Sequence, residues 1–144
     1  MGKKKEADDR FKKFGTVSFT AISKVNDFIG YLEEGKIMGS TCVECGRVFF
    51  PPRADCHECL SSNMEWFEVK GAGTLATYSL LIYAPAGFTD DAPYRVAVLD
   101  YGKYKVFGRI SSDLSEDDIS VGMEMTAVAN TLPNGQLNYV FEKA

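Results

Sequence analysis

The sequence lacks the features that mark membrane-spanning or exported chains. Its longest apolar runs, such as Leu80–Tyr83, fall far short of the roughly 20 residues that a membrane-spanning helix needs. The charged residues 1–13 are followed by no apolar stretch of the kind found in secretory signals. Residue six is Glu6, where myristoylation requires serine or threonine. We therefore expect a soluble, cytoplasmic protein.

An excess of positive charge is also missing. The chain has 16 lysine and arginine residues against 20 aspartate and glutamate residues, and residues 70–144 alone hold six basic and nine acidic side chains. This balance disfavours binding to nucleic-acid phosphates. Residues 1–13 are the exception, with six basic and three acidic side chains. A nucleic-acid or membrane arm is one interpretation of this run, but its shortness and its acids favour a flexible, solvated tail.

The chain has four cysteines, and their spacing is specific. All four cysteines fall in two C-x2-C pairs: Cys42, Cys45, Cys56 and Cys59. Two such turns can supply the four sulfur ligands that zinc prefers, and Gly46 suits the turn that follows the first pair. A ribbon this short buries too little apolar surface to fold alone, so metal binding and folding should be coupled.

Other interpretations of the cysteines are weaker but not all excluded. The sequence shows no export signal, and thiols in the cytosol stay reduced, so disulfides are disfavoured. The C-x2-C motif occurs twice, which disfavours a redox-active pair. Four sulfurs around iron would have the same spacing, so an electron-transfer centre stays open. The single histidine, His57, lies inside the second pair, and with four cysteines present it is interpreted as a bystander.

The assignment of the four cysteines and the single histidine also argues against catalysis by this chain alone. Thioester carbon–carbon cleavage needs a cysteine nucleophile with a base beside it. Here every cysteine is assigned to the metal, and a zinc ion with four thiolates has no open position for water. The acidic run Glu116–Asp118 is interpreted as a solvated loop. We therefore predict no catalytic residues.

Periodicity predicts one short helix before the cysteines. Four apolar residues recur at the spacing of a single helix face: Val25, Phe28, Ile29 and Leu32. Ser23 is a candidate N-cap, and Gly35 is a candidate residue for ending the helix in a left-handed conformation.

Beyond residue 70 the pattern predicts strands. Five runs rich in β-branched and aromatic residues are separated by glycine, proline or asparagine: Thr74–Tyr83, Tyr94–Leu99, Tyr104–Ile110, Gly122–Val128 and Gln136–Phe141. Asn134-Gly135 before the last run is a strong hairpin signal. Five strands in about 70 residues fit a small closed barrel of the oligonucleotide/oligosaccharide-binding (OB) type.

Taken together, residues 28–128 resemble the acyl-CoA-associated proteins that join a rubredoxin-like zinc ribbon to an OB-fold barrel. The motifs that carry the resemblance are, in chain order, Glu34–Ile37, Cys42–Gly46, Phe50–Arg53, Cys56–Cys59, Glu65–Trp66, Gly71–Leu75, Ala92–Tyr94 and Val121–Met123. One departure is Leu60, where the family often has glycine; it is expected to strain the second cysteine turn slightly. The residues before Lys24 lie outside the shared pattern.

The resemblance implies a mainly β fold with a short N-terminal helix. The expected division is a flexible N-terminal extension over residues 1–23, a helix and zinc ribbon over 24–69, and an OB-fold barrel over 70–144. It also implies a stable complex with a thiolase-like or hydratase-like enzyme that acts on acyl-CoA. In such a complex the barrel can lie beside the coenzyme A channel, and zinc is structural.

Two groups of residues are candidates for contact with that enzyme or with coenzyme A. The loop Ala84–Pro93 exposes Phe88 and precedes Tyr94 and Arg95. The second group is basic and could pair with phosphates: Lys103, Lys105 and Arg109. For each residue taken singly, an ordinary surface position is the competing interpretation. A nucleic-acid-binding zinc-ribbon/OB module and a rubredoxin-like electron carrier remain the alternatives for the whole chain.

Overall fold

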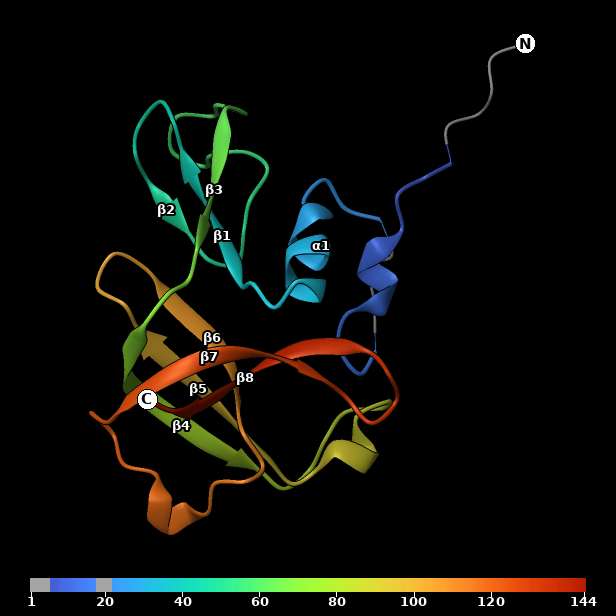
Figure 1. Ribbon diagram of the computed structural model, residues 1–144, viewed down its shortest axis with the longest axis vertical. Coiled ribbons are helices and arrows are strands. Elements are labelled where there is room, and N and C mark those ends of the chain that lie inside the picture. The colour runs from blue at the N-terminus through green and yellow to red at the C-terminus, as the bar shows by residue number, and fades with distance from the viewer. Residues whose placement is uncertain (1–5, 18–21) are drawn as a thin grey trace.

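The structure is a computed structural model that describes residues 6–17 and 22–144. Figure 1 shows a small three-stranded sheet with a helix beside it, placed against one side of a five-stranded barrel. The helical elements are η1 (Arg10–Lys13), α1 (Asp27–Glu33), η2 (Thr89–Asp91) and η3 (Glu116–Asp118). None of the helices in the described ranges is long and apolar enough to span a membrane.

The small sheet carries the cysteine turns and has the strand order β2-β1-β3. Its strands are β1 (Met38–Cys42), β2 (Val48–Phe49) and β3 (Met64–Glu68). Both neighbours run antiparallel to β1, with Thr41 opposite Val48 and Cys42 opposite Met64. The last residue of β1 is thus the first cysteine, so the sheet fixes where the metal centre begins.

The remaining strands close into a barrel of order β4-β5-β6-β8-β7, which confirms the predicted five-stranded OB-type barrel. The strands are β4 (Ala72–Leu81), β5 (Tyr94–Asp100), β6 (Lys105–Ile110), β7 (Glu124–Thr131) and β8 (Leu137–Lys143). All pairs are antiparallel except β6 with β8, whose parallel pairing closes the barrel.

The predicted strand bounds were close but not identical, and β4 shows why. It was expected to run to Tyr83 but ends at Leu81, which pairs with the first residue of β5, Tyr94. Residues 82 and 83 therefore have no partner strand. Pro93, which directly precedes Tyr94, has no backbone N–H with which to extend the pairing of β4 and β5.

Helix α1 begins later than its apolar stripe suggested. Asn26, not Ser23, is the N-cap residue, and its side chain makes no capping hydrogen bond. Ser23 instead accepts a hydrogen bond from the Val25 N–H through its Oγ, which makes a turn before the helix. Gly35 has φ +82°, which confirms its predicted place at the helix end.

One hydrophobic core links the helix and part of the ribbon to the barrel, and a second, smaller cluster lies at the cysteine turns. The buried side chains of α1, such as Ile29 and Leu32, belong to the same cluster as Leu75 and Phe141 of the barrel. Aromatic contacts extend this junction: Phe50 meets Tyr139 edge-on at 5.8 Å, and Phe67 lies 4.9 Å from Tyr104. The ribbon is therefore packed on the barrel.

Part of the expected flexible extension is packed as well. Phe11 stacks on Phe28 of α1 at 6.1 Å, and Phe14 meets the same ring edge-on at 5.7 Å. The Gly15 N–H donates to the Leu137 carbonyl at 2.7 Å, which ties the segment to β8. Figure 1 shows this segment beside α1 and the β7–β8 hairpin. The basic run Lys3–Lys5, expected to be part of the tail, lies outside the described residues.

Candidate metal centre

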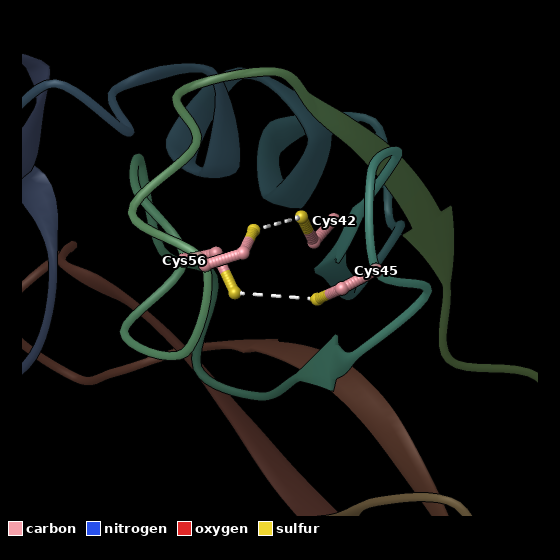
Figure 2. A group of neighbouring side chains, drawn as sticks. Cys42, Cys45 and Cys56 are labelled. Carbon is pink, nitrogen blue, oxygen red and sulfur yellow. Dashed lines mark hydrogen bonds between the residues drawn. The ribbon is translucent and has the colours of Figure 1, made fainter.

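The four predicted ligands meet at one point. The sulfur atoms of Cys42, Cys45, Cys56 and Cys59 all lie within 4.8 Å of one another. Two of the separations are 3.5 Å, from Cys42 to Cys59 and from Cys45 to Cys56, so each short contact joins one turn to the other (Figure 2). No other group of histidine, cysteine or carboxylate side chains in the described ranges gathers as a metal site.

The two turns are built alike. In the first, the Gly46 N–H donates to the Cys42 carbonyl at 2.8 Å, and the Cys42 N–H donates to the carbonyl of the residue after Gly46, also at 2.8 Å. In the second, the Leu60 N–H donates to the Cys56 carbonyl at 3.0 Å, and the Cys56 N–H donates to the Ser61 carbonyl at 2.9 Å. Each turn therefore presents its two sulfurs in the same way.

The likeness of the two cysteine turns explains why Leu60 has a positive φ. Gly46 has φ +76° and Leu60 has φ +61°, and Leu60 is the one non-glycine residue with positive φ among those described. A side chain in this left-handed region is strained, as the resemblance led us to expect. Leu60 is also 81% exposed, so packing does not offset the strain.

Burial and backbone N–H groups shape the acidity of the thiols. Hydrogen bonds from the backbone N–H groups of Cys59 and Glu58 lower the pKa of Cys56 to about 7, although burial of the thiol acts in the opposite direction. The Ser61 N–H favours the Cys59 thiolate, but the neighbouring thiols and burial outweigh it and raise the pKa of Cys59 to about 12. One thiolate thus makes the next harder to form, so a metal that binds all four sulfurs must displace protons.

The charged neighbours of the cluster are engaged with one another. Arg47 pairs with Glu58 at 3.3 Å, and His57 approaches the same carboxylate at 3.4 Å. The His57 ring also meets Phe49 edge-on at 5.3 Å, and Arg53 lies over the face of Phe49. His57 lies outside the group of four sulfurs, in keeping with its interpretation as a bystander.

The geometry of the cluster fits zinc. Four sulfurs at about 2.3 Å from one ion in tetrahedral geometry would lie about 3.8 Å from each other. The separations found here, from 3.5 Å to no more than 4.8 Å, bracket that value. Such a site has all four positions filled by protein, which suits a structural ion rather than one that activates water.

The structure separates the other candidate contact residues into two places. The loop Ala84–Pro93 lies at the start of β5, whereas Lys103 and Lys105 lie at its other end, where Lys105 pairs with Asp100. A seven-residue strand spans about 20 Å, so these groups do not form one site.

The two candidate arginines are also engaged in ion pairs. Arg95 donates to Glu116 at 3.1 Å, and Arg109 donates to Asp91 at 2.8 Å. The sequence did not predict an apolar cavity that lies against Arg109, with walls that include Phe14 and Val17 of the N-terminal segment. The aromatic residues within the charged N-terminal run were the signal that could have indicated it.

The fold and the four-sulfur cluster define a zinc-ribbon protein with an OB-fold barrel. Two adjoining family models match it: the ChsH2 rubredoxin-like zinc ribbon domain over residues 31–65, and the ChsH2 C-terminal OB-fold domain over residues 66–130. A DUF35 domain-containing scaffold protein of Methanothermobacter thermautotrophicus is 32% identical over 114 residues, which are 74% of this chain and 84% of the relative. The chain therefore belongs to the DUF35 family, with the zinc-ribbon and OB-fold arrangement of ChsH2.

Further relatives agree with this assignment. A DUF35 domain-containing scaffold protein of Methanocaldococcus jannaschii is 33% identical over 94 residues, which are 64% of this chain and 66% of the relative. Among solved structures, a chain of the Ltp2-ChsH2(DUF35) aldolase superposes with a TM-score of 0.68 at 21% identity, over 84% of this chain and 95% of that chain. At this identity the likeness shows the fold.

Proposed function

We propose that this chain is a non-catalytic, zinc-binding scaffold subunit of a cytoplasmic enzyme complex that processes acyl-CoA. The observation that carries the proposal is the convergence of all four cysteines on one point in a DUF35 fold. Curated relatives bear the name of scaffold proteins, and a structural neighbour with the same fold belongs to an aldolase complex. The proposed partner is a thiolase-like enzyme that forms or cleaves a carbon–carbon bond in a CoA thioester.

In this proposal Cys42, Cys45, Cys56 and Cys59 hold one zinc ion, and the ion has a structural role. When bound, zinc would fix the two turns relative to β1 and β3, because three of the four cysteines lie outside any strand. Using all four thiols in this way leaves the nucleophile of a thiolase reaction to the partner. Coenzyme A or acyl-CoA, where it meets this chain, would do so at the interface with the enzyme.

Two exposed apolar residues directly after β4 support a docking role. Ile82 is 66% exposed and Tyr83 is 90% exposed, and they adjoin the loop Ala84–Pro93. Large exposed apolar side chains that lie together are typical of protein interfaces, and tyrosine is often an anchor there. We place the enzyme contact at this end of the barrel. In its narrowest form, the proposed partner is the thiolase that cleaves 2-benzoylsuccinyl-CoA in anaerobic toluene degradation.

Native mass spectrometry of the tagged chain, purified from its own host, tests the proposal. We expect a complex that contains one zinc per copy of this chain and an acyl-CoA-processing enzyme. Replacing both docking residues with aspartate (Ile82→Asp, Tyr83→Asp) should remove the enzyme and leave the zinc. Val121→Asp is the matched control, because Val121 is 64% exposed but lies before β7, at the opposite end of β4.

Isolation of the chain with nucleic acid or alone, with no bound enzyme, would contradict the proposal. Red colour with visible absorption would instead indicate iron and the electron-carrier alternative.

A further inference from the structure

An apolar cavity of about 610 Å³ lies against the outer surface of β5 and β6. Val96 of β5 and Arg109 of β6 are directly opposite each other in the ladder, and both line it. Alternation along β6 buries Val106 and Gly108 in the barrel and turns Phe107 and Arg109 outward. The second and third strands of an OB fold are the face on which ligands commonly bind, so the cavity occupies a functional position.

Leu81 of β4 and Tyr139 of β8 also line the cavity, together with three segments that are distant in sequence. Residues 14–17 of the N-terminal segment, Phe88 of the β4–β5 loop and Leu132 of the β7–β8 turn meet over the strands. The packing is close, because a Cβ added to Gly87 would lie 2.5 Å from the Cγ2 of Val17. A hollow of this size, bounded on several sides, suits a small molecule better than a helix or a strand.

Arg109 supplies the one charged side chain in the cavity wall among the described residues. Its Nη1 donates to Asp91 at 2.8 Å, and its guanidinium lies 4.1 Å from the centre of the Tyr94 ring. Thr16 also donates to Asp91 through its hydroxyl. These contacts hold the guanidinium in place, and the carboxylate balances its charge.

The guanidinium retains donors for a ligand. Arginine carries five N–H groups, and within the described residues the hydrogen bond made by this guanidinium is the one to Asp91. The Arg109 side chain is 22% exposed and lines the cavity, so the guanidinium can be reached by a ligand there. A second anion beside Arg109 would be repelled by Asp91, whereas a neutral oxygen acceptor would not.

We propose that this cavity binds an uncharged apolar molecule with a carbonyl oxygen, such as an aromatic or aliphatic ester or ketone. Aromatic walls that include Phe14, Phe107 and Tyr139 receive the apolar body, and an Arg109 N–H donates to the oxygen. The inference goes beyond the proposed function, because this site lies within the chain and needs no partner enzyme.

Ligand-observed NMR on the full-length, zinc-loaded chain tests the site. The probe is ethyl 3-phenylpropanoate, and a ligand of its size should bind with a Kd of about 0.1–1 mM. Propylbenzene, which lacks the acceptor, should bind about fivefold more weakly. The charged 3-phenylpropanoate should bind about tenfold more weakly than the ester, because Asp91 repels it.

A matched pair of variants places the probe. Val96→Phe fills the cavity and should abolish binding, whereas Val98→Phe should leave it unchanged, since Val98 lies two residues along the same face and outside the cavity. In the wild-type chain, intermolecular nuclear Overhauser effects should join the probe to the Val96 methyl groups, and this holds even if a variant folds poorly.

Three results would overturn the inference. One is no binding of the ester at about 5 mM, several times the weakest expected Kd. Another is equal binding by the two variants. The third is that the ester does not bind, while Val96→Phe loses the enzyme complex and Val98→Phe keeps it. That result would make the cavity a contact point for the partner enzyme. The binding measurements use the isolated chain, so failure of the ligand site and failure of the scaffold proposal are distinguishable.

Discussion

At the scale of single residues, the metal centre decides the conformation of Leu60. The second cysteine turn repeats the hydrogen bonds of the first, and those bonds demand positive φ at the residue after the last cysteine. Glycine would adopt this conformation freely, whereas leucine adopts it at a cost of about 1–2 kcal/mol. The strain is tolerated because the metal site over-determines the turn.

Replacing Leu60 with glycine should therefore stabilise the protein. We expect the free energy of unfolding to rise by about 0.5–1 kcal/mol, because relief of the strain exceeds the extra entropy of glycine in the unfolded chain. Leu60→Ala is the control, since alanine keeps the strain and the leucine side chain is mostly exposed. Urea unfolding of the zinc-loaded proteins measures both. A glycine variant no more stable than the alanine variant would show that the turn is unstrained.

At the scale of elements, local signals in the sequence identified the cysteine turns, the helix and the five strands. Periodicity, turn residues and C-x2-C spacing are written in neighbouring residues, so these elements could be predicted. The N-terminal segment could not, because Phe11 and Phe14 stand among charges and meet their partners, Phe28 and Tyr139, only after the chain has folded. The cavity could not be predicted for the same reason, because its walls come from segments that are distant in sequence.

Phe14→Ala tests the packing of the N-terminal segment. The ring joins the helix to β8, so we expect the free energy of unfolding to fall by about 2 kcal/mol, less than for a fully buried phenylalanine. Lys12→Ala should change it by less than about 0.5 kcal/mol, because its exposed ion pair with Asp9 contributes little. Equal effects, measured by urea denaturation, would mean that the segment behaves as the solvated tail first expected.

At the scale of the whole molecule, one hydrophobic core joins α1 and the adjoining part of the ribbon to the barrel, while the cysteine turns have a separate small cluster around Cys42, Phe49 and Cys56. Val69 of the ribbon–barrel connection and the buried residues of α1 lie in the same cluster as the barrel interior. Loss of the ribbon would expose that surface, so the two halves should unfold together. Sequence motifs identified both halves but not this coupling, which rests on contacts such as that between Phe67 and Tyr104.

Zinc removal tests the coupling. After treatment with a chelator, the thermal midpoint of the barrel should fall by about 10 °C or more, in one transition that is followed by tyrosine circular dichroism. Re-addition of zinc should restore the midpoint, and magnesium should not, because thiolates are poor ligands for magnesium. A barrel transition that is unchanged by zinc removal would show that the two halves are independent.

In the proposed metal centre, four thiolates close on one zinc ion. X-ray absorption at the zinc edge of the freshly isolated protein measures this directly. We expect four sulfur neighbours at about 2.3 Å and no oxygen or nitrogen neighbour. Fewer sulfurs with a light-atom ligand, or a protein isolated without zinc, would contradict it.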